Sequence, residues 1–179
     1  MKSIKDLIKH LLGMDKNSIE ALRSRGVRIG ENCSISTDYI DYGHGFLVSI
    51  GDNVTIAVNA MILTHDASTK PFLGYSKVGS VSIGNDVFIG AGSIILPGVS
   101  IGKNVIIGAG SVVTRDIPDN SVAVGNPAKV IGSTRDYIDK NRKLMNAAPI
   151  YNTYWANKTS EEKNKMIEEL HGGVIGFDI

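Results

Sequence analysis

The sequence predicts a mainly β protein whose chain winds as a coil of six-residue repeats, with short helices at both ends. Three observations predict it: aliphatic residues recur at every sixth position, small residues follow them, and aromatic residues make up only 6% of the 179 residues. A period of six is neither the α-helical period nor simple strand alternation. A coil of this kind buries a core only by stacking neighbouring turns.

The six-residue spacing runs through most of the middle of the chain. The aliphatic residues that keep it are Ile29 and Ile35, then Ile50, Ile56 and Ile62, then Ile83, Ile89, Ile95, Ile101, Ile107 and Val113. Glycine with Asn or Asp two positions later recurs between them, at 30–32, 51–53, 84–86 and 102–104. Because Gly, Asn and Asp tolerate positive φ, we expect the chain to turn its corners there.

Two breaks interrupt this spacing. Ile62 and Ile83 are 21 residues apart, which leaves 15 residues beyond one regular step and predicts an inserted loop over 67–80. Ile35 and Ile50 are 15 residues apart, which is not a multiple of six. Interruptions of a repeat usually carry function or an interface.

Both ends of the chain have helical features. Apolar residues between positions 4 and 12 follow helical spacing, and a second helix is expected to begin near Ser18. Thr159 and Glu162 have the spacing of a capping box for a helix over 160–171, and 134–146 suits another helix. We therefore expect a helical cap over 1–26, a coil domain over 27–132 and a helical extension over 133–179.

Composition narrows the cellular context. The formal net charge of +1 gives no reason to expect a nucleic-acid partner. No apolar stretch is long enough to span a membrane, and charges interrupt the N-terminal segment where a signal peptide would be apolar. A single cysteine, Cys33, cannot form an intrachain disulfide. We expect a cytoplasmic protein with no membrane span.

The repeat, its corner residues and the closing segment Gly125-Asn126-Pro127-Ala128-Lys129-Val130-Ile131 resemble the hexapeptide-repeat acyltransferases, and most closely their saccharide, maltose and galactoside O-acetyltransferases. The resemblance covers about residues 27–132. It implies a left-handed parallel β-helix with three hexapeptides in each coil. It also implies a homotrimer with clefts between subunits, acetyl-CoA as cosubstrate and no required metal.

The candidate catalytic residues are His44 and His65, because each lies at a break in the repeat. Thr64-His65-Asp66 resembles the catalytic segment of saccharide acetyltransferases, which implies that His65 is the general base. An attacking hydroxyl must lose its proton, and imidazole titrates near neutral pH. His44 falls where related serine acetyltransferases place their catalytic histidine, so it is a second base, a substrate ligand or a structural residue.

The acceptor that orients the catalytic histidine stays open at this point between Asp38, Asp41, Asp66 and a backbone carbonyl. Adjacent side chains of a strand point to opposite faces, so Asp66 is not the automatic partner of His65. The candidates for substrate contact are Asp41, Tyr42, Asp66 and Tyr75. The resemblance implies that acetyl-CoA contacts Ala91, Gly92, Ala109, Gly110 and Thr114, and that Arg115 and Lys129 meet its phosphates.

The sequence thus favours an acetyl-CoA-dependent O-acetyltransferase that acts on a sugar hydroxyl by direct attack, without an acyl-enzyme. The alternatives are N-acetylation of an amino sugar and a non-catalytic scaffold. Carbonic anhydrases also use this β-helix, but their zinc requires three histidines. Here His44 and His65 are 21 residues apart, and His10 and His171 lie outside the coil.

Overall fold

The computed structural model describes residues 18–179. The described residues form two compact units, which meet between Thr134 and Arg135 in the sequence. The helical spacing at positions 4–12 and His10 lie outside the described residues.

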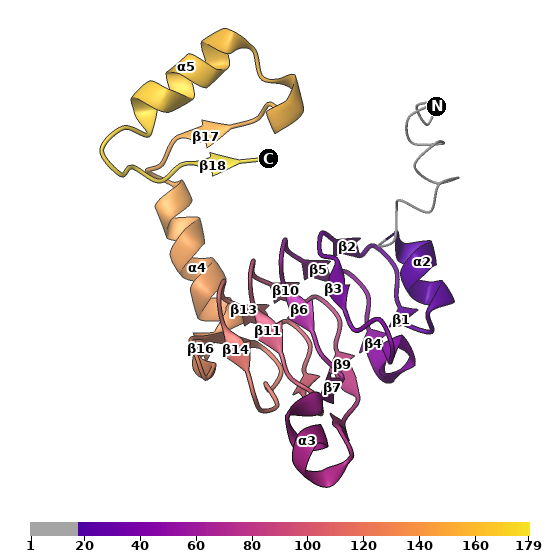
Figure 1. The fold of residues 1–179 in the computed structure, drawn as a ribbon. Coiled ribbons are helices and arrows are strands. Elements are labelled where there is room, and N and C mark those ends of the chain that lie inside the picture. Colours follow the sequence, from indigo (N-terminus) through magenta and orange to yellow (C-terminus); the bar gives the residue numbers. More distant parts are fainter. Residues whose placement is uncertain (1–17) are drawn as a thin grey trace, which may run out of the picture. The chain divides into compact units, whose positions relative to one another are not determined.

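The first unit is built from three mainly parallel sheets, which the chain visits in rotation from β1 to β14 apart from one excursion (Figure 1). The first sheet holds β1 (Arg28–Ile29), β4 (Val48–Ile50), β9 (Val81–Ile83) and β12 (Ser100–Ile101). The second holds β2 (Ser34–Ile35), β5 (Thr55–Ile56), β10 (Phe88–Ile89), β13 (Ile106–Ile107), β15 (Ser121–Val124) and the antiparallel β16 (Lys129–Ser133). The third holds β3 (Tyr39–Ile40), β6 (Met61–Ile62), β11 (Ile94–Ile95) and β14 (Val112–Val113). The result is a three-sided coil whose regular elements are almost all short strands.

The six-residue spacing is the distance along the chain from one sheet to the next. Ile89 pairs in register with Ile56 on one side and with Ile107 on the other, so equivalent aliphatic residues stack through the coil. The aliphatic residues from Ile50 to Val113 that keep the spacing are all buried in one core. The repeat and the mainly β character predicted from the sequence are confirmed.

At the corners, glycine and the Asn or Asp two positions after it have different structural roles. Asn32, Asn53, Asp86 and Asn104 adopt positive φ between 54° and 57°, as the sequence predicts. The glycine before each of them has another role, because a Cβ on Gly84 would lie 2.8 Å from the backbone of Gly102 in the next coil. Glycine is required there by the close stacking of coils and not by its φ angle.

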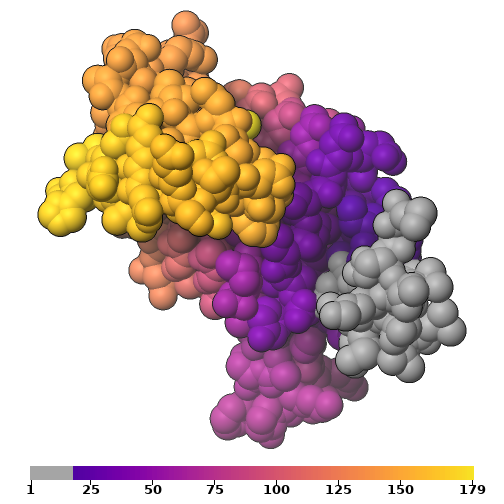
Figure 2. Space-filling model, turned by 90° about the horizontal axis from the view of Figure 1, so that it is seen from above, coloured from indigo at the N-terminus to yellow at the C-terminus, as the bar shows by residue number. Residues whose placement is uncertain are grey.

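Both breaks of the repeat leave the third sheet. After β3 the chain forms a short 3-10 helix, η1 (Gly45–Leu47), before it enters β4. After β6 it forms β7 (His65–Asp66), η2 (Ala67–Thr69), α3 (Lys70–Leu73) and β8 (Lys77–Val78). β7 and β8 pair antiparallel at the base of this excursion, and the excursion stands out from the coil (Figures 1 and 2).

A short helix begins the described part of the coil. α2 (Ile19–Ser24) starts where the sequence predicts, with the Ser18 hydroxyl accepting a hydrogen bond from the Ala21 N–H. Its Leu22 is fully buried in the core of the coil. The helix therefore covers the first coils with an apolar side chain.

The second unit begins within α4 (Thr134–Met145) and also contains β17 (Ile150–Tyr151), η3 (Trp155–Asn157), α5 (Ser160–Glu169) and β18 (Phe177–Asp178). The capping box of Thr159 and Glu162 at the start of α5 is confirmed. The parallel pair β17–β18 was not predicted, and beside it the buried Lys158 ammonium binds Asp178 and the Thr153 carbonyl. Among residues 18–179, none of the helices is long and apolar enough to cross a membrane.

Candidate active site

The register of the third sheet brings its two breaks together. β3 pairs with β6 in parallel, with Tyr39 beside Met61 and Ile40 beside Ile62. Asp41 continues this pairing, since its N–H donates to the Ile62 carbonyl at 3.0 Å. The residues that follow each strand, among them His44 and His65, therefore meet at one corner of adjacent coils.

The Asp41 carboxylate is the centre of this corner. Oδ1 accepts hydrogen bonds from the backbone N–H groups of Gly43 and His44, both at 3.1 Å. Oδ2 accepts from the Thr64 N–H at 3.1 Å, from the Thr64 hydroxyl at 2.8 Å and from His65 Nδ1 at 2.5 Å. Burial raises the pKa of this carboxyl, but the hydrogen bonds from His65, Thr64 and His44 outweigh burial and hold the pKa well below its usual range. Asp41 is therefore ionised at neutral pH.

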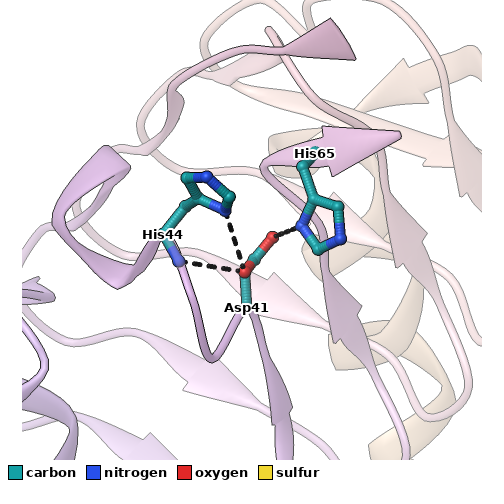
Figure 3. Close-up of side chains that lie close together, drawn as sticks. All are labelled: Asp41, His44 and His65. Carbon is teal, nitrogen blue, oxygen red and sulfur yellow. Dashed lines mark hydrogen bonds and ion pairs between the residues drawn. The ribbon is translucent and has the colours of Figure 1, made fainter. Parts of the chain in front are cut away.

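This carboxylate fixes the tautomer of His65. An ionised carboxylate only accepts hydrogen bonds, so the ring hydrogen of neutral His65 lies on Nδ1. Nε2 then keeps its lone pair and can accept a proton, which is the arrangement that a general base requires. The His65 side chain is 44% exposed while that of Asp41 is 1% exposed, so a solvent-accessible base is held by a buried acceptor (Figure 3).

His44 lies beside this pair in a different relation to Asp41. Its ring centroid is 5.2 Å from that of His65, and its Nδ1 lies 3.7 Å from Asp41 Oδ1. That distance is too long for a hydrogen bond. Within residues 18–179, the buried His44 Nδ1 has no hydrogen-bond partner. Both histidines thus turn Nδ1 toward one carboxylate, but only the His65 ring is within hydrogen-bond distance of it, while His44 is bonded to it through its backbone N–H (Figure 3).

An open hollow of about 230 Å³ adjoins His65 on the outer face of the third sheet. Its walls are largely apolar. They are formed by Asp38, Tyr39, Ile40, Asp41, Tyr42, Met61, Leu63 and His65. The Arg25 guanidinium lies 4.9 Å from the centroid of the Tyr42 ring, in a cation–π contact at the edge of this hollow.

The four residues predicted to contact substrate lie in different environments. Tyr42 lines the hollow and is exposed. Tyr75 is exposed on the excursion, after α3. The Asp66 carboxylate binds Lys77 Nζ at 2.6 Å and the Ser68 N–H at 2.8 Å, and these bonds hold its pKa well below the usual range. Asp41 is buried and fully bonded, so its geometry fits the orienting role better than direct contact with substrate.

The residues predicted to bind acetyl-CoA lie elsewhere on the coil. Ala91 and Ala109 are exposed at the corner between the second and third sheets in successive coils, and the Gly110 N–H donates to the Ala91 carbonyl at 2.8 Å. No heavy atom would lie within 4 Å of a Cβ on Gly92 or Gly110, so this corner is open on its outer side. Thr114 and Arg115 are exposed after β14, and Lys129 is exposed at the start of β16.

Sequence reasoning missed the role of Thr64, which is fully buried and binds Asp41 through both its N–H and its hydroxyl. The signal was its position two residues after Ile62. Because strand residues two apart share a face, a polar residue there points inward with the core isoleucines. Such a residue must have a buried partner.

A coil of six-residue repeats is shared by a class of bacterial transferases. The family model described as bacterial transferase hexapeptide (six repeats) matches residues 80–115. Protein CapG of Staphylococcus aureus is 46% identical over 140 residues, which cover 75% of this chain and 78% of CapG.

Two solved structures resemble the chain as well. A hexapeptide-repeat acetyltransferase of Vibrio cholerae O1 biovar eltor, complexed with acetyl-CoA, is 27% identical with a TM-score of 0.54, over 62% of this chain and 61% of that one. A galactoside acetyltransferase in complex with coenzyme A is 37% identical with a TM-score of 0.50, over 64% of this chain and 58% of that one. The chain belongs to the hexapeptide-repeat transferase family, and it is an acetyltransferase.

Proposed function

We propose that this chain transfers the acetyl group of acetyl-CoA to a hydroxyl of a saccharide, with His65 as the general base. The observation that carries the proposal is the 2.5 Å hydrogen bond from His65 Nδ1 to the buried Asp41, which leaves Nε2 free at the edge of an open hollow. The similarity to a galactoside acetyltransferase bound to coenzyme A supports the saccharide and the cosubstrate.

The reaction is a single displacement in which His65 moves one proton. The acceptor hydroxyl attacks the thioester carbonyl carbon as Nε2 of His65 takes its proton. The carbon–sulfur bond then breaks, the acetyl ester forms, and His65 returns the proton to the departing sulfur. Asp41 stabilises the imidazolium that exists between these two transfers, because its carboxylate is ionised and bonded to Nδ1.

His65 is the better candidate base than His44 because its tautomer is fixed. A hydrogen bond to a carboxylate decides which nitrogen carries the hydrogen, and His44 Nδ1 lacks such a bond at 3.7 Å. The hollow beside His65 suits a sugar ring, since Tyr39 and Tyr42 offer aromatic faces next to polar edges. N-acetylation of an amino sugar is a second outcome that the same base supports.

The open Ala–Gly corner fits a cosubstrate that lies flat against backbone. Ala91 and Ala109 carry the smallest side chains, and Gly92 and Gly110 leave open space. We infer that acetyl-CoA runs along this corner, with Arg115 and Lys129 near its phosphates. We further infer a left-handed coil and a homotrimer in which such corners face the His65 corners of neighbouring subunits, as in the family that the sequence resembles.

The test is acetyl transfer by wild type and His65→Ala to a panel of mono- and oligosaccharides and amino sugars, followed as free thiol release. His171→Ala, which removes an exposed histidine of the second unit, is the matched control. We expect transfer to fall by more than about a hundredfold in His65→Ala, with acetyl-CoA binding intact. Unchanged transfer in His65→Ala would move the assignment to His44. Failure of wild type to bind acetyl-CoA would favour the scaffold alternative.

A further inference from the structure

We propose that Asp41, His44 and His65 also form a binding site for a divalent transition-metal ion of the zinc type, and that the bound ion inhibits acetyl transfer. The binding site stands on the geometry of these three side chains alone. The inhibition rests on the proposed function, because it acts through the general base.

The three side chains provide the donor set that such ions prefer. Each offers one ligand atom, and the three atoms lie within 4.8 Å of one another. Imidazole nitrogen and carboxylate oxygen bind zinc at about 2.0–2.2 Å, so donors on one ion lie at most about 4 Å apart. Small side-chain rotations suffice to close the set around an ion.

The environment of His44 is the observation that indicates a bound ligand. A buried polar atom without a partner costs free energy, and Nδ1 of His44 is such an atom within the described chain. Proton transfer requires one imidazole and one orienting acceptor, which His65 and Asp41 already supply. His44 Nδ1 nevertheless faces the same carboxylate at 3.7 Å, which is close to the separation of two donors on one zinc ion (Figure 3).

The charge and the access of the corner also suit a cation. Asp41 contributes a negative charge, and the histidine side chains are 38% and 44% exposed, so water can complete the coordination. The carboxylate takes the place of the third histidine that the sequence lacks for a carbonic-anhydrase set. Two histidines and one carboxylate are an established ligand set for catalytic metals with open coordination positions.

The ion would inhibit by changing the tautomer of His65. A metal bound to Nδ1 displaces the hydrogen from that atom, and the neutral ring then carries its hydrogen on Nε2. Nε2 no longer has a lone pair for the proton of the acceptor hydroxyl. The ion therefore blocks proton transfer while it leaves the Ala–Gly corner free, and acetyl-CoA still binds.

The test uses the full chain after chelator treatment and dialysis. Zinc chloride is titrated by calorimetry and cobalt chloride by visible absorption, with wild type, His44→Ala, Asp41→Asn and the control His171→Ala. We expect one ion per chain in wild type and in His171→Ala, and an affinity at least about tenfold lower in His44→Ala and Asp41→Asn. His44 is partly exposed, so His44→Ala remains informative if circular dichroism shows that Asp41→Asn fails to fold. Equal zinc affinity in His44→Ala and wild type, or no binding by wild type, overturns the site.

The inhibition is tested separately with the same proteins. We expect zinc to reduce transfer by wild type and His171→Ala, with an inhibition constant equal to the calorimetric dissociation constant and with recovery on adding chelator. Acetyl-CoA affinity should stay unchanged by zinc. Metal binding by a protein that transfers no acetyl group would sink only the proposed function, whereas an active enzyme that binds no zinc would sink only the metal site. Zinc binding without loss of transfer overturns the inhibition.

Discussion

Asp41 Oδ2 and His65 Nδ1 lie 2.5 Å apart although 24 positions separate the two residues in the chain. The in-register pairing of β3 with β6 causes this contact, because it sets the ends of both strands side by side. Asp41 is held by Thr64 and by two backbone N–H groups, so it cannot follow His65 if the ring moves. The pair is therefore rigid on the carboxylate side and adjustable on the imidazole side.

Asp41→Asn should reduce kcat by at least about a hundredfold and leave KM for acetyl-CoA little changed. An amide at this position can donate to Nδ1, which would place the ring hydrogen on Nε2 and remove the base. Steady-state kinetics with the best acceptor from the saccharide panel would measure both constants. Asp139→Asn, which removes an exposed carboxylate of α4, is the control and should leave both constants unchanged. A rise in KM for acetyl-CoA without loss of kcat would contradict the orienting role.

Gly84→Ala should lower the free energy of unfolding by about 1–3 kcal/mol, because the added methyl group would press against the backbone of the next coil. Gly132→Ala is the matched control, since no heavy atom lies within 4 Å of the Cβ it adds. Urea unfolding of both variants measures the difference. Equal stability of the two variants would mean that the coils can separate at this corner without cost.

Arg115→Gln and Lys129→Gln should each weaken acetyl-CoA binding by about threefold to tenfold, if these side chains meet its phosphates. In at least one of the two variants, the loss of affinity should be smaller for an acetyl-CoA analogue that lacks the 3′-phosphate. The loss of acetyl-CoA affinity should also shrink at high ionic strength. Calorimetric titration of both ligands makes the comparison, with the exposed Lys103→Gln as control. Equal affinity in all variants would remove both residues from the cosubstrate site.

As the pH falls, the start of α5 should lose stability before the coil unfolds. Hydrogen bonds from the Thr153 hydroxyl and the Thr159 N–H lower the pKa of Glu162. A carboxyl whose pKa is lower in the folded state stabilises fully above its unfolded pKa, about 4.3, and loses this contribution as the pH falls through the folded pKa.

Hydrogen exchange of the α5 amides between about pH 6 and about pH 3 should therefore show falling protection at the acidic end. Glu162→Gln should have lower protection throughout and a flatter pH response. Glu161→Gln changes an exposed neighbour and should behave as wild type. An identical pH response in Glu162→Gln and wild type would show that another group controls the transition.

The coil could be predicted because its periodicity is local. Each aliphatic residue, such as Ile89, contacts equivalent residues one coil away, so the same spacing specifies both sheet and core. The pairing of Asp41 with His65 could not be predicted, because it depends on where each break leaves the repeat and on how many residues it inserts. The sequence left Asp38, Asp41 and Asp66 as alternatives, and only the pairing of β3 with β6 separates them.

In the second unit, the helices could be predicted from the sequence but the strand pair could not. Its helices carry local signals such as the Thr159 capping box. β17 and β18 are two residues each with 25 residues between them, which leaves no periodicity to detect. Lys158 is buried there only because Asp178 and the Thr153 carbonyl bind its ammonium group, a pairing that a lone lysine in the sequence does not indicate.

The stacking of coils also sets the spacing of residues in neighbouring coils. Neighbouring strands lie about 4.8 Å apart, and the rings of His44 and His65, which follow strands one coil apart, have centroids 5.2 Å apart. Backbone positions that are equivalent in successive coils are therefore separated by whole multiples of the strand spacing, and the side chains set the distance between their functional groups. The distance between two functional groups in such a coil thus depends first on how many coils separate their residues and then on the side chains.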